Sequence, residues 1–542
     1  MNPSLQPGGE WSVPAQVVAA ARPPLTAVQK LLLPLGVFLF DWLFWRERGG
    51  LNMLVFNVFI VGAQLVQLPR HAAARRSGYF WLMVVGSLLS GGMMAVYGSA
   101  VAALACSVSV LLLLGYVNQP SLKLLLYAGL TGLGSAAEAW LRVLRGVRPP
   151  QTAGAGVRRS WFYGRLLLVP LGILGAFHGL FAVANPVYAR LSSRVLDVLE
   201  EWLLRLLPDI SLGHLLFLGL GFVVAAAVVV AVPVYFFADQ ESGFGEFVRR
   251  QRDRVASLAV RRPDFRLKTT KALDLRKEYL VAVAVFGLVN ALLLVVNAID
   301  VRWLWFGFEP GPGFDLAQFV HEGTYVLIFS ILLAMGIVLW FFRRNLNFYA
   351  PGLRVLRWGA TVWVLQNAVL AVSVGLRNYY YILNSGVAYK RIGVCFFLLL
   401  VFFGLATVLG KIWQQRSAYS LVRLNSLALY AVLLLLAAGN WEVWMTEYNL
   451  QPRFRSVDIG FLLDMPDRTL PTLLAHRAVL DRTTHLTVNA EYGTSAVIDA
   501  SEAQRRLDLA VAAARARYTE YDHWQGFTWA DYQAAQQLGH HE

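Results

Sequence analysis

Three apolar runs between His321 and Asn425 decide the fold: HEGTYVLIFSILLAMGIVLWFF (residues 321–342), GATVWVLQNAVLAVSVGL (359–376) and IGVCFFLLLVFFGLATVLG (392–410). Each run is about as long as the ~20 apolar residues that a helix needs to cross the ~30 Å hydrocarbon layer of a membrane. A fourth run begins near Ser420. Because short polar segments join these runs, the stretch predicts neighbouring transmembrane helices that run up and down.

The composition of the whole chain predicts the same fold class. Of the 542 residues, 57% are hydrophobic and 15% are charged, whereas soluble domains carry about 25% charged residues. Further apolar runs lie at about residues 31–45, 51–68, 79–97, 100–116, 122–141, 161–184, 212–237 and 280–299. We therefore predict an all-α, polytopic transmembrane bundle of about twelve spans with a small, mainly helical C-terminal extramembrane domain.

Changes in composition divide the chain into five predicted parts. They are a disordered N-terminal segment (residues 1–28), an N-terminal bundle of about seven spans (29–237), a basic cytoplasmic loop (238–279), a C-terminal bundle of about five spans (280–439) and an acidic extracytoplasmic domain (440–542).

The basic loop sets the predicted topology. Arginine and lysine outnumber acidic residues in segment 238–279, so the positive-inside rule places it in the cytoplasm. Alternating spans then put the acidic tail outside. The segment RHAAARRSG (70–78) conflicts with this count, because it is basic but falls outside. Either one early run does not fully cross the membrane, or the charge bias is imperfect.

Polar residues gather at one end of the runs in the second half of the chain. In an up-and-down bundle these positions share a membrane face: Asn297, Asp300, His321, Glu322, Arg377, Asn378, Tyr389, Lys390 and Arg391. One hypothesis is an outer-face pocket for an anionic lipid head group or envelope metabolite. Arg377, Lys390 and Arg391 would bind the anion, with His321 and Glu322 as a proton-responsive partner.

The alternative for this outer-face group is that its members are interfacial anchors and interhelical ion pairs. A charge costs roughly 3 kcal/mol or more at the bilayer centre but much less at the interface. The substitution Arg377→Ala separates the two hypotheses. A binding residue would leave the amount of protein unchanged and abolish the cellular phenotype, whereas an anchor would lower the amount.

Amide side chains also occur inside the apolar runs. Gln366 and Asn367 lie in the middle of residues 359–376, while Asn57 and Gln64, seven residues apart, lie on one face of an early run. Buried amides need partners in an apolar medium. Hydrogen bonds between helices are one explanation, and a substrate path through the bundle is the other.

The chain carries few signs of catalysis. Its two cysteines, Cys106 and Cys395, lie inside apolar runs, and no metal-ligand spacing or hydrolase, protease or nucleotide motif stands in a suitable context. We therefore predict no catalytic residue, no metal and no cofactor. The formal net charge is +15, and the basic residues lie mainly between the apolar runs. We therefore expect them to determine the membrane topology rather than to bind nucleic acid. The expected partners are membrane lipids and an envelope protein that contacts the C-terminal domain, with the oligomeric state left open.

Several segments together resemble an uncharacterised bacterial membrane family, the domain-of-unknown-function group 4153/4173. They are VNAIDVRWLW (296–305), FVHEGTYVLIFSILLA (319–334), RRNLNF (343–348), WVLQNAVL (363–370), LRNYYYI (376–382) and YKRIGVCFFLLL (389–400), with a fainter likeness at GLNMLVFN (50–57). The resemblance implies a polytopic inner-membrane protein with an extracytoplasmic C-terminal portion and no assigned activity. This chain has Val387-Ala388 where relatives read Leu-Thr, so no hydroxyl-dependent role is expected there.

Two classes of function follow. The first is a binding, regulatory or scaffold protein of the bacterial inner membrane, with a polar site at its outer face. The second is a transporter or lipid-handling protein that moves a small polar or lipid substrate through the bundle, and an enzyme acting on lipid-linked substrates is a weaker alternative. A transporter requires a continuous polar path from Gln366 and Asn367 to one surface, whereas a scaffold is packed solid at its centre.

Overall fold

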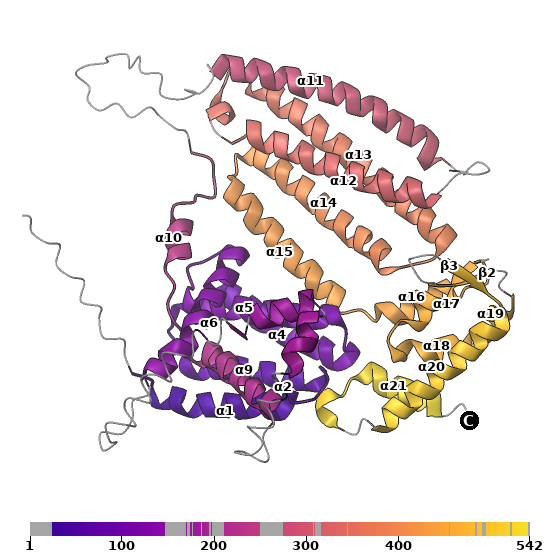
Figure 1. The fold of residues 1–542 in the computed structure, drawn as a ribbon. Coiled ribbons are helices and arrows are strands. Elements are labelled where there is room, and N and C mark those ends of the chain that lie inside the picture. Colours follow the sequence, from indigo (N-terminus) through magenta and orange to yellow (C-terminus); the bar gives the residue numbers. More distant parts are fainter. Residues whose placement is uncertain are drawn as a thin grey trace, which may run out of the picture. The chain divides into compact units, whose positions relative to one another are not determined.

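The computed structural model confirms the all-α helical bundle (Figure 1). It describes residues 24–146, 170, 174–175, 177–185, 187–194, 197, 211–249, 275–306, 308, 316–343, 345–454, 456–482, 485–489, 495–520 and 523–539. The chain divides into two compact units, residues 1–41 with 136–230 and residues 42–135 with 231–542. Most of the predicted N-terminal segment, of the run at 161–184 and of the basic loop at 238–279 lies outside the described residues.

In the first unit, helix α1 (Ala27–Phe44) packs against α9 (Leu212–Val229). The Phe40 and Phe217 rings lie 5.0 Å apart, and Asp41 Oδ1 lies 2.8 Å from Nε2 of His214. The Phe40 ring packs directly against the backbone of Gly221, because glycine has no side chain at this position. The two helices therefore approach closely there. Asp41 and His214, both about a quarter exposed, are thereby each other's polar partner within the unit.

The second unit holds most of the long helices. Their bounds are α2 (Leu51–Gln67), α4 (Gly78–Tyr97), α5 (Ala100–Asn118), α6 (Leu125–Gly146, whose last residues belong to the first unit), α11 (Leu275–Asp300), α12 (Leu316–Phe341), α13 (Leu353–Ser385), α14 (Tyr389–Gln414) and α15 (Ala418–Ala437). Short elements between them are α3 (Ala73–Arg76), α10 (Phe236–Ser242), the π-helical turn η1 (Val301–Trp305) and η2 (Asn345–Phe348).

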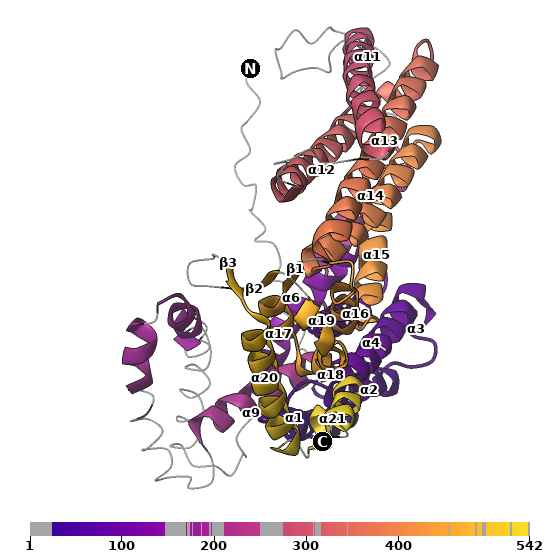
Figure 2. The ribbon, with the colours of Figure 1, turned by 90° about the vertical axis from the view of Figure 1, so that its right-hand side faces the viewer.

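Helices α11 to α15 lie side by side, with α13 between α11 and α14, and α14 next to α15 (Figures 1 and 2). Helix α15 in turn packs on α4 and α5, so it joins the two predicted bundles. The limits of the five predicted parts of the chain remain predictions.

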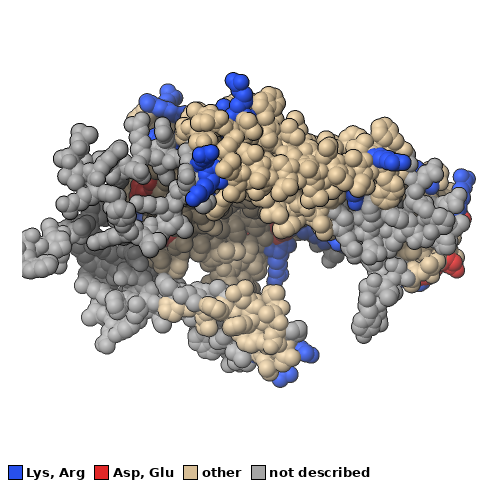
Figure 3. Space-filling model, turned by 90° about the horizontal axis from the view of Figure 1, so that it is seen from above, with Lys and Arg blue, Asp and Glu red and all other residues tan. Residues whose placement is uncertain are grey.

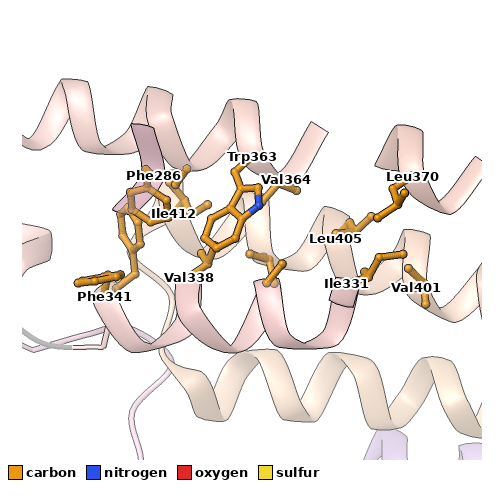
Figure 4. Packing of buried hydrophobic residues seen from close by; sticks show 14 of the residues in the cluster. Phe286, Ile331, Val338, Phe341, Trp363, Val364, Leu370, Val401, Leu405 and Ile412 are labelled. Carbon is orange, nitrogen blue, oxygen red and sulfur yellow. The ribbon is translucent and has the colours of Figure 1, made fainter. Parts of the chain in front are cut away.

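The centre of α11 to α14 is closely packed with large apolar side chains (Figure 4). Trp363 is only 2% exposed, and its ring meets the edge of the Phe286 ring at 5.3 Å. Val338 of α12 and Ile412 of α14 belong to the same cluster. In a bilayer the surrounding lipid is as apolar as these residues, so close van der Waals contact rather than removal from water holds the helices together.

The chain from residue 441 onward, here called the C-terminal domain, is mainly helical and carries one small sheet. Its elements are α16 (Trp441–Asn449), β1 (Ser456–Asp458), α17 (Ile459–Leu463), η3 (Asp467–Thr469), α18 (Leu470–Ala475), α19 (Arg477–Arg482), β2 (His485–Asn489), β3 (Ser495–Ile498), α20 (Ala500–Glu520), η5 (Trp524–Gly526) and α21 (Trp529–Gly539). Strand β2 lies between β1, to which it is parallel, and β3, to which it is antiparallel. Leu480, Leu507 and Leu538 are fully buried in the domain core.

Eight of the described helices are long and apolar enough to cross a membrane, and α2 and residues 325–341 of α12 form shorter apolar helices. Helix α11 exposes Leu288, Leu292 and Val295 on its outer side. Viewed from the α11 side, much of the surface is a tan area without charged side chains (Figure 3). These features identify a multi-pass membrane protein, while the total of about twelve spans remains a prediction.

Helices α4 and α15 are parallel, and this corrects the predicted side of segment 70–78. Tyr79 in the first turn of α4 and Arg423 in the second turn of α15 are joined by a hydrogen bond of 3.2 Å. Seven residues further along each helix, Gly86 faces the Tyr430 hydroxyl. Parallel neighbours begin at the same membrane face, so the segment before α4 lies at the same end as the segment before α15. The conflict in the charge count therefore disappears.

Two ends of the second unit can now be defined. The basic end carries residues 68–77, 119–124, 241–249, 343–352 and 411–417, which are linked by contacts such as the 2.9 Å bond from Lys123 N to Glu241 Oε1 and the 2.9 Å bond from Gln415 Nε2 to Asn347 O. The domain end carries the C-terminal domain and residues 45–50, 98–99 and 386–388, where Leu51 N donates to Phe527 O at 2.9 Å. Residues 119–124 and Glu241 therefore lie at the same end of the unit.

Cysteine labelling tests this assignment. We expect His71→Cys and Gln414→Cys to react with a membrane-impermeant maleimide from the same side, and Ser385→Cys to react only from the other side. All three positions are exposed. Labelling is measured on intact and on permeabilised cells, with the unsubstituted protein as the background for its own two cysteines. Reaction of His71→Cys and Ser385→Cys from one side would show that the parallel arrangement is wrong.

Candidate functional site

A row of polar side chains joins α11 to α13. Gln366 Nε2 donates to Asn290 Oδ1 at 2.8 Å, and Asn290 Nδ2 donates to the carbonyl oxygen of Gly359 at 2.9 Å. Asn297 Nδ2 donates to the carbonyl oxygen of Gln366 at 3.0 Å. Asn290 and Asn297 are seven residues apart, as are Gly359 and Gln366, so each pair lies on one face of its helix. The predicted amides therefore hold two helices together.

This polar row ends in a buried ion pair at the domain end. Arg377 Nη2 lies 2.8 Å from Asp300 Oδ1, and the two side chains are 10% and 7% exposed. The π-helical turn η1 follows Asp300 directly, and Trp305 at its end donates to Ser373 Oγ at 3.0 Å. The charge of Arg377 is thus neutralised within the protein by Asp300, which belongs to the same predicted outer-face group.

The turn between α13 and α14 is held by Asn378 and Arg391. Asn378 Nδ2 donates to the carbonyl oxygen of Arg391 at 3.0 Å. The Arg391 guanidinium donates to the carbonyl oxygens of Ser385, at 2.6 Å, and Gly386, and it lies 3.9 Å from the centre of the Tyr381 ring. Gly386 has a φ of +75°, a conformation that suits glycine. Arg391 therefore satisfies the last carbonyl groups of α13, as cations at helix C-termini do.

The same turn is the docking point of the C-terminal domain. Asn449 at the end of α16 accepts a hydrogen bond from Val387 N at 2.6 Å and donates one to Val387 O at 2.8 Å. Tyr389 donates to Glu442 Oε1 at 3.3 Å, and Glu442 Oε2 lies 3.2 Å from Arg468 Nη2. Both side chains of that ion pair are buried, so the domain and the turn form one polar network.

The structure brings together six of the nine residues of the outer-face group: Asn297, Asp300, Arg377, Asn378, Tyr389 and Arg391. Lys390 is exposed to the surroundings. His321 and Glu322 lie in α12, but their side chains are outside the described residues. Because Asp300 and backbone carbonyls engage Arg377 and Arg391, the geometry favours the anchoring hypothesis over an anion pocket at this end.

The other intramembrane amides lie apart from this network. Asn57 Nδ2 of α2 donates to Ser87 O of α4 at 2.8 Å and lies 3.0 Å from Cys106 Sγ of α5. Gln64 is buried on the same helix. Asn367 donates to the carbonyl oxygen of Trp363, one turn earlier in its own helix, at 2.8 Å. These contacts link or stabilise helices, and they do not extend the row of Gln366.

Sequence reasoning missed a second polar cluster, at the basic end. Glu241 Oε1 accepts hydrogen bonds from Tyr419, at 2.7 Å, and from the backbone nitrogens of Lys123 and Leu124, at 2.9 and 3.0 Å. Arg423 pairs with Glu246 at 3.2 Å. The excess of basic residues in segment 238–279 concealed these two carboxylates, whose partners lie more than a hundred residues away. Glu442, Arg468 and Asn449 were also missed, because the contacts of Glu442 with Tyr389 and of Asn449 with Val387 join segments more than fifty residues apart.

Within the described part of the chain, no group of three His, Cys, Asp or Glu side chains is placed to hold a metal ion. The arrangement consists of ion pairs and amide contacts between apolar helices. Such groups join helices in a membrane at about 1 kcal/mol per interhelical hydrogen bond.

The fold and its polar network define a multi-pass integral membrane protein. The chain belongs to the family defined by the domain of unknown function DUF4153, whose sequence model matches residues 78–476. The match confirms the family resemblance and covers all the segments from residue 296 to residue 400 that carried it, whereas the fainter likeness at residues 50–57 lies outside the match. Comparison with curated proteins gave no match, and comparison with solved structures gave none either.

Proposed function

We propose that this protein is a binding or scaffold protein of the bacterial inner membrane, whose helices hold the C-terminal domain at the outer face. The observation that carries the proposal is the clamp between Asn449 and the α13–α14 turn. Both polar atoms of the Asn449 side chain bond the backbone of Val387, at 2.6 and 2.8 Å. Val387 and Ile392 also pack against the apolar core of the domain. The domain is thus packed against the ends of α13 and α14 and is not connected to them by the chain alone.

The centre of the helices supports a scaffold more than a conduit. Gln366 and Asn367 bond neighbouring backbone and side-chain groups, and Trp363, Phe286 and Val338 fill the space around α13. A transporter needs a polar path that reaches one surface. The row from Asn290 to Arg377 is instead a set of direct contacts between α11 and α13.

Charge supports the orientation with the C-terminal domain outside. Arg70, Arg75, Arg76, Arg343, Arg354, Arg357, Lys411 and Arg416 all belong to the basic end or its first helical turns, and such clusters stay in the cytoplasm. In the tail, acidic residues outnumber the arginines and lysine is absent. A partner in the envelope would contact this acidic domain.

Asn449→Ala tests the clamp and the proposal together. We expect the variant to accumulate normally, because the domain keeps its own core, but trypsin should cleave the purified chain within residues 440–542 about tenfold faster, since two hydrogen bonds worth ~0.5–1.5 kcal/mol each are lost. In cells that depend on the protein, the variant should fail to restore the phenotype. Asn384→Ala is the matched control, because this exposed amide bonds only the neighbouring Ser385 Oγ, at 3.1 Å.

Two results would contradict the proposal. One is full function of Asn449→Ala despite faster cleavage, because the held position of the domain would then be dispensable. The other is reproducible flux of labelled lipids or ions into proteoliposomes that contain the wild-type protein, compared with protein-free liposomes. Such flux would support the transporter or lipid-handling alternative.

A further inference from the structure

The basic end contains a cavity of about 650 Å³, lined by residues of α6, α14 and α15, by residues 243–249 and by Arg343, which follows α12. Apolar and aromatic residues make up most of its wall, including Leu124, Leu126, Phe244, Phe247 and Val422. Phe244 and Phe247 are exposed. A wall of this kind suits a hydrocarbon chain.

Three cations also line this cavity: Arg249, Arg343 and Lys411. None of the described residues that line it is acidic. Glu241, the nearest carboxylate in sequence, is occupied by Tyr419 and by two backbone nitrogens. The charge of the cavity wall is therefore positive.

Lys411 is the strongest sign of a ligand. Its side chain is only 1% exposed, and its ammonium group donates to the carbonyl oxygen of Arg416 at 2.9 Å. An ammonium group has three donors, and a buried charge without a counter-ion is costly. Nearby, the Arg343 guanidinium stacks on Trp340 at 3.3 Å, and its buried Nε has no hydrogen-bond partner. An anionic oxygen in the cavity would satisfy both groups.

We propose that this cavity binds the phosphate group of an anionic membrane lipid, with Lys411 and Arg343 on the phosphate and the apolar wall along the chain. A lipid combines the two chemistries that the cavity offers, a negative charge and hydrocarbon. The position at the basic end places the site beside the leaflet that carries anionic lipids in the orientation proposed above. The proposal of a lipid site is based on the residues that line the cavity and does not depend on the proposal that the protein is a scaffold.

The test compares three probes on the purified full-length protein in a neutral detergent. They are phosphatidylglycerol, phosphatidylcholine with the same acyl chains, and inorganic phosphate. We expect phosphatidylglycerol to bind and to raise the melting temperature, with little effect of the other two. Binding is counted by native mass spectrometry, which separates protein with and without one lipid.

Three variants assign the binding to this cavity. Lys411→Met, which keeps the length and apolar stem of the side chain, and Arg343→Gln should each weaken phosphatidylglycerol binding about tenfold, as loss of a charge-assisted contact does. Arg354→Gln is the control, because this exposed arginine lies at the same end outside the cavity wall. If the Lys411→Met variant does not fold, phosphatidylglycerol binding by the Arg343→Gln variant alone tests whether the lipid binds in this cavity. Equal binding of the two lipids, equal stabilisation by inorganic phosphate, or unchanged binding by Arg343→Gln overturns the proposal.

Discussion

Replacing Arg377 with alanine is expected to reduce the amount of folded protein severely. The substitution leaves the carboxylate of Asp300 buried, 2.8 Å from where its counter-ion stood. Breaking a buried pair in this way costs about 3–5 kcal/mol, because the remaining charge is uncompensated. The measurement is the melting temperature in detergent, together with the monodisperse fraction of a fluorescent fusion in size-exclusion chromatography.

Arg302→Ala is the control for Arg377→Ala, since Arg302 is exposed in the neighbouring turn η1. The double variant Asp300→Asn with Arg377→Gln should recover most of the lost stability, because neither side chain then carries a charge. Normal abundance and melting temperature of Arg377→Ala with a lost cellular phenotype would contradict this expectation. That outcome would support the hypothesis that Arg377 binds an anionic ligand.

Gly115→Ala should be almost as damaging, although it adds a single methyl group. At Gly115 an added Cβ would lie 1.9 Å from the carbonyl oxygen of Ala128, so the backbones of α5 and α6 touch there. A helix backbone cannot move aside as a side chain does. We therefore expect a loss beyond the ~1–3 kcal/mol typical of overpacking, measured as melting temperature and yield.

The control for this contact is Gly129→Ala on the opposite helix. Its added Cβ would meet only Leu112 Cδ2, at 3.7 Å, which is ordinary contact. A helical alanine in place of glycine is favourable by roughly 0.5–1 kcal/mol, so this variant should be neutral or slightly more stable. Equal stability of the two variants would show that α5 and α6 lie further apart than described.

The individual helices could be predicted well from the sequence, because the length and the ends of each apolar run can be read directly from the residues that make it up. The run at 359–376 became the centre of α13, and the run at 392–410 became the centre of α14. Which helices are neighbours was not predictable in the same way. Helices α4 and α15 meet through Gly86 and Tyr430, and nothing local to either residue indicates the other.

The polar residues show the same limit. Asn297 and Asp300 lie near the end of one apolar run and were predicted to share a membrane face with Arg377. Their partners, Gln366 and Arg377, were also among the predicted residues, but the pairing itself was not predicted. The network with Glu442 and Asn449 was missed, because contacts between distant segments of the chain leave no periodic signal in the sequence.

The hydrogen bond between Ser109 of α5 and Tyr430 of α15 joins residues 321 positions apart. A ribosome therefore delivers α4 and α5 to the bilayer long before their partner emerges. Until α15 emerges, Gly86 of α4 and Ser109 of α5 lack the contacts with Tyr430 that they make in the folded protein. The packing of α15 on α4 and α5 is therefore a late step in the assembly of the second unit.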